Sequence, residues 1–397
     1  MPFVNASGEA KNDTLALRLG QKAADYLGKY TWLRAIGSGG AAKPAADPIA
    51  AARELNADYV VTAEVDSGAD SPRATFHVDD AHSGARLWSQ TLAPILEDPK
   101  SSAAEEELAG RAGSLMKGAI FNAELTRAKA KKAGELTSYD CVILGLADNP
   151  DTTARARDCL EAAAQKEPLN ANVWVALSGV IRAQRIVGWG LPPEEAVIEK
   201  RSHLADRVFQ AGLRAVDLAP HDAGAQTQLA FSYQAKCEKD RFRTEAEKAV
   251  ALNRYDADNL GLLGIFLAFS GFWDEGATFA EKAIKLTGPS AQPEWWYAPA
   301  KRHWIRGEYQ EAYDDFQRSY QEFSPDAHLD FAYTLPFLGR IEESKAQVAT
   351  ILKLDPTMTI RKNDAFYRLL CVEPAFREKM AGALRQAGLP EGEATSN

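Results

Sequence analysis

The sequence predicts an α/β plus all-α protein, in which a small mixed α/β domain precedes an α-solenoid of repeated helix pairs. Three observations predict this. From residue 137 onward a helix-pair ending recurs at intervals of about 34 residues. Before that point, segments with helical and with strand periodicity alternate. Between the two parts, residues 103–133 carry a continuous helical pattern with a basic end.

The repeated ending is an apolar or small residue, a short amphipathic stretch, and a proline or a residue that replaces it. Within a unit, large residues precede a small one, as in Leu263 and Gly264, and a glycine marks the inter-helix turn, as at Gly271, Gly307 and Gly339. Small residues let the paired helices approach closely. The endings fall at residues 163–168, 215–220, 249–254, 283–288, 319–324 and 351–356.

This pattern resembles the tetratricopeptide (TPR) repeat. The resemblance implies six units over residues 137–356, and therefore twelve antiparallel helices, with an insertion near residues 186–203. Residues 357–397 are then expected to form a helical cap and tail. Because a TPR unit is a packing device with no chemistry of its own, the resemblance implies a curved helical surface that holds a partner.

Residues 1–102 are expected to form the α/β domain, and residues 103–136 the connecting helix. Apolar residues at helical spacing predict a first helix over residues 14–30, and Asp47 and Pro48 suit the cap and first position of a second helix. The expected order is β-α-β-α-β-β-β-α. The strands after the first are expected at residues 32–36, 59–65, 73–78 and 85–93, the last two forming a hairpin about residues 80–84.

Four segments of this part resemble the TolB-like amino-terminal domain: residues 2–8, 32–34, 52–61 and 80–88. Residues 376–377 and 384–391 are similar to the usual end of the proteins that carry it. The resemblance implies a regulatory role, since the domain precedes TPR arrays in bacterial adenylate cyclases and winged-helix transcriptional regulators. The family's glycine and basic residue are missing around residues 63–66, so no ligand contact carries over there. The short first strand predicts that an upstream catalytic or DNA-binding domain is missing from this chain.

Composition and charge narrow the function classes. A net charge of −9 and a pI near 5.4 give no basic face, so direct nucleic-acid binding is not expected. The longest uncharged apolar stretch, residues 260–273, falls inside a repeat and predicts a buried helix, so no membrane association is expected. Four cysteines without Cys-x-x-Cys spacing predict free thiols in a reducing compartment, the cytoplasm. They are Cys141, Cys159, Cys237 and Cys371.

Candidate chemistry is sparse. Residues 37–40 are glycine-rich after an expected strand, but the next helix begins too late for a phosphate loop, so a plain loop is the better interpretation. His77, Asp79, Asp80 and His82 could bind a metal, but hairpin-turn roles explain them better. We therefore expect no catalytic residue, no metal and no cofactor, and no enzyme activity.

The binding surface is the stronger candidate. Positions of each first helix that face away from the packing residues should line a groove, and they alternate aromatic with cationic or amide side chains, which suits an extended protein or peptide partner. Burial between repeats is an equal alternative for each aromatic residue. Trp189, in the insertion, is either a partner contact or a lid on neighbouring helices. The groove positions are Arg182, Thr227, Phe231, Gln234, Ile265, Phe269, Tyr297, Lys301, Trp304 and Tyr333.

The sequence thus favours a non-catalytic regulatory and protein-binding module that controls a cyclase-like or transcription-regulator output through its TPR groove. One alternative is a free-standing scaffold that assembles a protein complex, for which a homodimer is compatible. The other is a sensor that binds a small ligand through the α/β domain.

Overall fold

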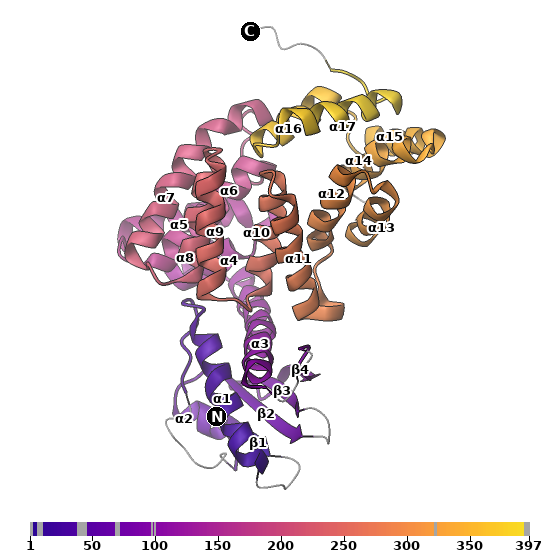
Figure 1. Ribbon diagram of the computed structural model, residues 1–397. Helices are drawn as coiled ribbons and strands as arrows, with labels where there is room; N and C mark the ends of the chain where they lie inside the picture. Colours follow the sequence, from indigo (N-terminus) through magenta and orange to yellow (C-terminus); the bar gives the residue numbers. More distant parts are fainter. Residues whose placement is uncertain are drawn as a thin grey trace.

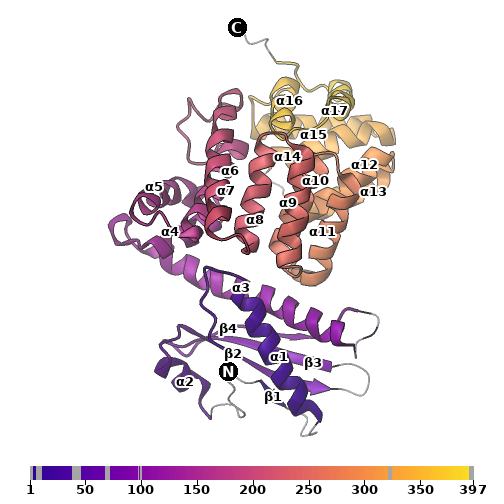
Figure 2. The ribbon, with the colours of Figure 1, turned by 60° about the vertical axis from the view of Figure 1, so that its left-hand side comes forward.

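The computed structural model describes residues 3–5, 11–37, 46–67, 72–96, 98, 101–320 and 324–392. An α/β domain lies at one end, and the long helix α3 (Ser102–Ala130) runs between its sheet and an array of paired helices (Figures 1 and 2). The last two helices, α16 (Ile360–Leu369) and α17 (Pro374–Gln386), lie across the opposite end of the array.

The α/β domain contains a four-stranded sheet in the order β1-β2-β3-β4. Its strands are β1 (Val4–Asn5), β2 (Tyr59–Ser67), β3 (Pro72–Asp80) and β4 (Arg86–Leu92). β1 is parallel to β2, and the other neighbours are antiparallel, with the expected hairpin between β3 and β4. Helix α1 (Lys11–Gly28) and α3 cover one face, and α2 (Pro48–Glu54) begins at the Asp47 cap that the sequence predicts.

The alternation of apolar and polar side chains along the strands decides which face of the sheet the helices cover. Val65, Phe76 and Val78 are fully buried against Leu19 and Met116 of the two covering helices. The intervening side chains of β2 and β3 are mostly polar and point to the other face. This is the pattern of a sheet with one packed and one solvated side.

The strand expected at residues 32–36 does not form. The chain leaves α1 through successive turns, in which the amide of Leu33 donates to the carbonyl of Tyr30, and Trp32 packs edge-on against Phe121 of α3. The edge of β2 that this strand would need is occupied by β1. The observed order is therefore β-α-α-β-β-β-α.

Within the described residues, twelve α-helices follow α3 before the C-terminal two. A connection containing a 3₁₀ helix, η2 (Ile198–His203), and Trp189 interrupts the second pair where the sequence predicts an insertion. No helix in the described ranges is both long and apolar enough to cross a bilayer. The twelve are α4 (Ser138–Leu146), α5 (Pro150–Lys166), α6 (Ala171–Val187), α7 (Leu204–Leu218), α8 (Ala223–Ala235), α9 (Lys239–Leu252), α10 (Ala257–Phe269), α11 (Trp273–Thr287), α12 (Tyr297–Arg306), α13 (Tyr309–Ser319), α14 (Pro325–Thr334) and α15 (Ile341–Leu354).

The inter-helix turns share one hydrogen-bond pattern. After α10, the amide of Phe272 donates to the carbonyl of Leu267, and Gly271 between them has a φ of 96°. A residue in the left-handed region followed by this bond is a helix-ending motif that favours glycine. Equivalent bonds follow at four further turns, donated by the amides of Glu238, Glu308, Arg340 and Val372.

Close helix contact in the fourth pair depends on two glycines. A β-carbon on Gly264 of α10 would lie 2.6 Å from the carbonyl oxygen of Gly276 on α11, and one on Gly276 would lie 2.5 Å from the carbonyl oxygen of Gly264. Backbone therefore touches backbone here, and any side chain at either position would push the two helices apart.

Helix α3 joins the α/β domain to the array through packing and charge. Gly110 of α3 lies directly beneath the ring of Tyr255, and Lys117 of α3 pairs with Asp258 and Asp256 at the start of α10. One apolar cluster runs from the sheet through α3 to Trp295. The two parts thus share a core.

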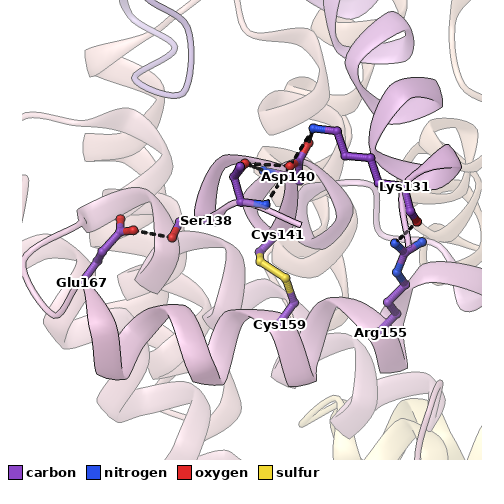
Figure 3. The surroundings of a disulfide bond; sticks show 8 residues. Lys131, Ser138, Asp140, Cys141, Arg155, Cys159 and Glu167 are labelled. Atoms are coloured by element: carbon purple, nitrogen blue, oxygen red, sulfur yellow. Dashed lines mark hydrogen bonds and ion pairs between the residues drawn. A yellow bond between two sulfur atoms is a disulfide. The ribbon is translucent and has the colours of Figure 1, made fainter. Parts of the chain in front are cut away.

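All four cysteines are paired, so the expectation of free thiols is wrong. Cys141–Cys159 joins α4 to α5, where the neighbouring Asp140 accepts from Lys131 and Thr137 (Figure 3). Cys237–Cys371 joins the turn after α8 to the turn after α16, across 134 residues of sequence. Sequence spacing could not predict these bonds, because each depends on how the helices pack.

We expect Gly264→Ala to lower the free energy of unfolding by about 1–3 kcal/mol, since the added methyl meets backbone atoms that cannot move aside. Gly118→Ala is the matched control. Gly118 also lies within a helix, and a β-carbon there meets nothing within 4 Å, so this variant should be unchanged or more stable by up to about 1 kcal/mol. Urea unfolding of both variants tests the contact, and equal stabilities would contradict it.

The disulfides predict the thiol content of the purified chain. Denatured without a reductant and treated with a thiol reagent, the protein should show no reactive cysteine, and after reduction it should show four. Four reactive thiols in the unreduced protein would contradict both bonds.

Candidate functional site

The candidate site is the inner face of the array, meaning the side of α6, α8, α10, α12 and α14 that faces the C-terminal pair, α16 and α17. In Figure 1 this pair spans the opening between the two ends of the array. The carbonyl of Leu369 at the end of α16 accepts from Arg185 of α6, and α17 packs on α14. The pair therefore runs from α6 to α14 against the C-terminal ends of the inner helices.

A buried amine forms the centre of the inner face. The Nζ atom of Lys301 on α12 lies 3.2 Å from an Oδ1 oxygen of Asp330 and 3.1 Å from the hydroxyl of Tyr367 on α16, and it also donates to the hydroxyl of Tyr333. Tyr333 donates to Asp330 in turn, and the hydroxyl groups of Tyr297 and Tyr367 are 2.7 Å apart. Every polar group of this network thus has a partner inside the protein.

Burial opposes charge on both members of the central pair. It lowers the pKa of Lys301 to about 8, against the attraction of Asp330, and it raises the pKa of Asp330, against the attraction of Lys301. The Lys301 Nζ lies 4.4 Å from the ring centre of Tyr297 and 4.6 Å from that of Tyr333, so aromatic faces supply part of the lost hydration.

A cavity of about 220 Å³ opens beside this network. Phe269 and Tyr297 from the array and Phe366 and Tyr367 from α16 give it aromatic walls. Its carboxylates are Glu294, Asp326 and Asp330. Asp326 is exposed at the margin, but its apolar surroundings and then the neighbouring Asp330 raise its pKa to about 6. Glu294 is also exposed, and partial desolvation by the surrounding groups raises its pKa.

The structure brings together five of the eleven residues that the sequence singles out for partner binding. Phe269, Tyr297, Lys301, Trp304 and Tyr333 lie together against the C-terminal pair, and all but the half-buried Tyr297 are buried. Tyr297, Lys301 and Trp304 do lie on one side of α12, as their spacing predicts.

The other six candidates take no part in the hydrogen-bond network around Lys301, although Phe231 belongs to the same apolar cluster and Ile265 lines the cavity. Phe231 is part of the core between α8, α9 and α10, and Arg182 stacks on its ring while pairing with Asp148. Gln234 is buried beneath α16, where its Nε2 donates to the carbonyl of Leu370. Trp189 is half-buried in the connection after α6. A partner role for these eleven residues stays a prediction.

Sequence reasoning missed the acidic and C-terminal members of the site. Asp326 and Asp330 lie one turn apart on α14, and Asp330 lies one turn before Tyr333, a spacing that places the three on one side of the helix. This spacing is a sequence signal from which the two acidic residues could have been predicted as site residues. Tyr367 and Phe376 were not predictable as site residues, because their contacts exist only when α16 and α17 fold back over the array.

The amino-terminal candidates have structural roles. Asp80 accepts from the amides of His82 and Ser83, which closes the β3–β4 hairpin, and Asp79 pairs with Arg86. Among the described residues no group of three or more His, Cys, Asp or Glu side chains is placed to hold a metal. Residues 38–40 of the glycine-rich loop lie outside the described residues.

No protein-family model and no curated protein matches the chain. Among solved structures it is similar, at 12% identity and a TM-score of 0.44, to a chain of the APC/C hetero-tetramer Cut9–Hcn1, covering 74% of this chain and 54% of that one. A TPR protein from Parabacteroides merdae gives 14% identity, a TM-score of 0.39 and coverages of 67% and 91%. Yeast Tom70 gives 12% identity, a TM-score of 0.35, and coverages of 74% of this chain and 75% of that one. The chain thus spans about half of the first of these, and its resemblance to a TPR array rests on its own helix pairs and repeated turns.

The buried pair predicts a specific response to substitution. Lys301→Met should lower the free energy of unfolding by about 3–5 kcal/mol, because it leaves the Asp330 carboxylate buried without a cation. The double variant Lys301→Met, Asp330→Asn should recover much of this loss, since the amide still accepts from Tyr333. Equal stability of the wild type and Lys301→Met in urea unfolding at pH 7 would contradict the network.

The same pair predicts a pH dependence. The pKa of Lys301 is lower in the folded chain, about 8, than its ordinary 10.5, so the unfolded chain binds more protons between these values. The cost of burying the charge is present below pH 8 and is removed as the pH rises above it, so the Lys301 contribution to stability should rise from pH 8 toward 10. The difference between the wild type and the Lys301→Met, Asp330→Asn variant isolates this slope.

Proposed function

We propose that the chain is a non-catalytic regulatory and protein-binding module that holds a partner segment on its inner face. The observation that carries this proposal is the cavity beside Lys301, where aromatic walls and carboxylates meet on the concave side of a helical-pair array. Partner segments commonly anchor a few side chains in such hollows.

The chemistry of the cavity indicates the kind of anchor. Asp326 and Glu294 both have raised pKa values, so each carboxylate lacks a cation close enough to offset its surroundings. A lysine or arginine side chain of the partner would supply that cation and lie against the rings of Phe269 and Tyr297. We therefore propose a basic segment as the partner.

The regulatory part of the proposal rests on the TolB-like resemblance and on the joint at α3. Lys117 pairs with Asp256 and Asp258 at the start of α10, and α10 also lines the cavity through Phe269. A partner on the inner face would thus act on a helix that is tied to the α/β domain. In this proposal the output is a cyclase-like or transcription-regulator effector joined to that domain.

Two alternatives use the molecule differently. A free-standing scaffold would use the same inner face without an effector, and measured partner binding alone would not separate it from the regulatory proposal. A small-ligand sensor would use the α/β domain and would bind no partner segment in the cavity of the inner face. Binding that depends on Asp326 would therefore count against the sensor.

The pairing of the cysteines bears on the cellular location of the chain. The cytoplasmic location expected from the sequence depended on free thiols, and that premise is wrong. Two disulfides favour an oxidising compartment, because such bonds persist where thiols are not kept reduced. We propose that location for the fully oxidised chain.

The test uses fluorescent peptides with a central lysine or arginine and matched peptides with glutamine at that position. The full chain should bind the basic peptides at pH 7.5 and lose them as the pH falls below about 6, because Asp326 then becomes protonated. Asp326→Asn should weaken binding about tenfold, the effect of one charge contact of about 1.4 kcal/mol.

The control is Glu247→Gln, which removes one exposed negative charge from α9, outside the cavity. It should bind the peptides like the wild type. Equal losses in Asp326→Asn and Glu247→Gln, or equal binding of basic and glutamine peptides, would contradict a basic-segment site.

A further inference from the structure

The C-terminal pair has the turn of a repeat unit but does not continue the stack. The bond from the amide of Val372 to the carbonyl of Tyr367 is the same as in the turns of the array. A next unit would lie beyond α15, whereas α16 contacts η2 and α17 contacts α14. Figures 1 and 2 show the pair lying across the array. The pair therefore lies against the inner face at the C-terminal ends of the inner helices.

The contacts of the pair are those of a helical ligand in a groove. At the middle of the face Phe376 stacks on Trp273, with ring centres 5.1 Å apart, and meets Trp304 edge-on at 4.9 Å. Tyr367 reaches Lys301 and Tyr297. Apolar side chains at helical spacing that fill a groove are the usual mode of helix recognition.

The pair is also held together within itself, so it can move as one body. The amide of Ile360 donates to the carbonyl of Pro390 over 2.9 Å, and Arg377 of α17 pairs with Asp364 of α16. Five residues, 355–359, connect α15 to α16. The two helices share a joint with the array at one end, and the disulfide fastens them at the other.

That disulfide occupies two unusual backbone positions. Cys237 has a φ of 59° and Cys371 a φ of 65°. The three turns between them carry Gly271, Gly307 and Gly339 at the equivalent position. A side chain in the left-handed region costs conformational energy that glycine avoids. Glycine would therefore adopt both turn positions more easily. Cysteine at these positions instead provides a bond between the array and the pair.

The two disulfides also differ in access. Cys237 is exposed and Cys371 is half-buried, whereas in the other disulfide Cys159 is half-buried and Cys141 is buried. Exchange rates depend on this access as well as on the attacking thiolate. The bond to the pair is therefore the more accessible of the two to a reductant.

We propose that the C-terminal pair is an intramolecular ligand of the inner face and that reduction of Cys237–Cys371 by a dithiol releases it, opening the face to a helical segment. This inference rests on the proposed function of that face. A thiolate of the dithiol attacks one sulfur, its second thiol resolves the mixed disulfide, and the dithiol leaves as a disulfide. Two electrons and two protons pass to Cys237 and Cys371, which become thiols.

The first experiment measures release without any partner. A full chain with Cys141→Ser and Cys159→Ser keeps only the bond to the pair, and amide hydrogen exchange is compared before and after reduction with dithiothreitol. Exchange over residues 360–386 should become faster by about tenfold or more, since these helices lose their covalent attachment, while α10 stays protected. Unchanged exchange over 360–386 overturns the proposal.

A second variant tests the same release in a chain that keeps the other disulfide, so that a folding defect of the first variant does not decide the result. Cys237→Gly, Cys371→Gly keeps Cys141–Cys159, relieves both turns and removes the attachment. Without any reductant its residues 360–386 should exchange as fast as in the reduced first variant. Protection equal to that of the oxidised wild type would show that packing alone holds the pair, which also overturns the proposal.

The third experiment asks whether the opened face takes a helix. A labelled peptide of residues 359–391 with Cys371→Ser should bind the Cys237→Gly, Cys371→Gly chain and not the oxidised wild type, and a peptide that also carries Tyr367→Ala and Phe376→Ala should bind neither. Equal binding to both chains contradicts the inference. If the pair is released but the basic peptides of the preceding subsection do not bind, the result supports this inference and contradicts the proposed cation site.

Discussion

The constraint on which this structure depends is that a helix pair cannot bury both of its faces by itself. The two helices of a pair pack their small-residue sides against each other, as Gly264 does against Gly276, and the pair is left with an aromatic inner side that water would otherwise meet. The chain meets that constraint with its own last two helices. Trp304, Tyr333 and Lys301 are buried because α16 and α17 lie over them.

Covering the inner face fixes the character of the site. An amine and a carboxylate taken out of water are tolerated only when every remaining polar atom has a partner, and three tyrosine hydroxyls supply those partners around Lys301 and Asp330. The network also ties the cover to the array, since Tyr367 belongs to α16 and Tyr297 to α12. Loss of the cover would therefore rehydrate the amine, so occupation of the face and the charge state of its centre are coupled.

Much of the helical part was predictable because it repeats. The period predicts the helices and the interruption after α6, and Gly271, Gly307 and Gly339 mark three turns correctly. The sequence does not reveal that Cys237 and Cys371 occupy equivalent turns, because a search for glycine passes over them. Nor could it place Arg182 or Phe231, since a single helix does not show whether its far side faces a groove or a neighbouring core. In the α/β domain the expected strand at residues 32–36 failed for a similar reason, because competition for the edge of β2 is a tertiary effect.

The two cysteine turns connect these points. In a stacked array, a repeat unit at the end of the described helices would keep one solvated side on its outer helix. Here that unit instead turns back and finds its packing surface on the inner face, and the disulfide makes the arrangement independent of the packing energy alone. The residues that would hold a partner now hold the pair. The affinity of the inner face for any outside segment therefore depends on how firmly the pair is held in place. A covalent bond is the firmest such restraint, and it is also one that a two-electron reduction removes without altering any residue of the face.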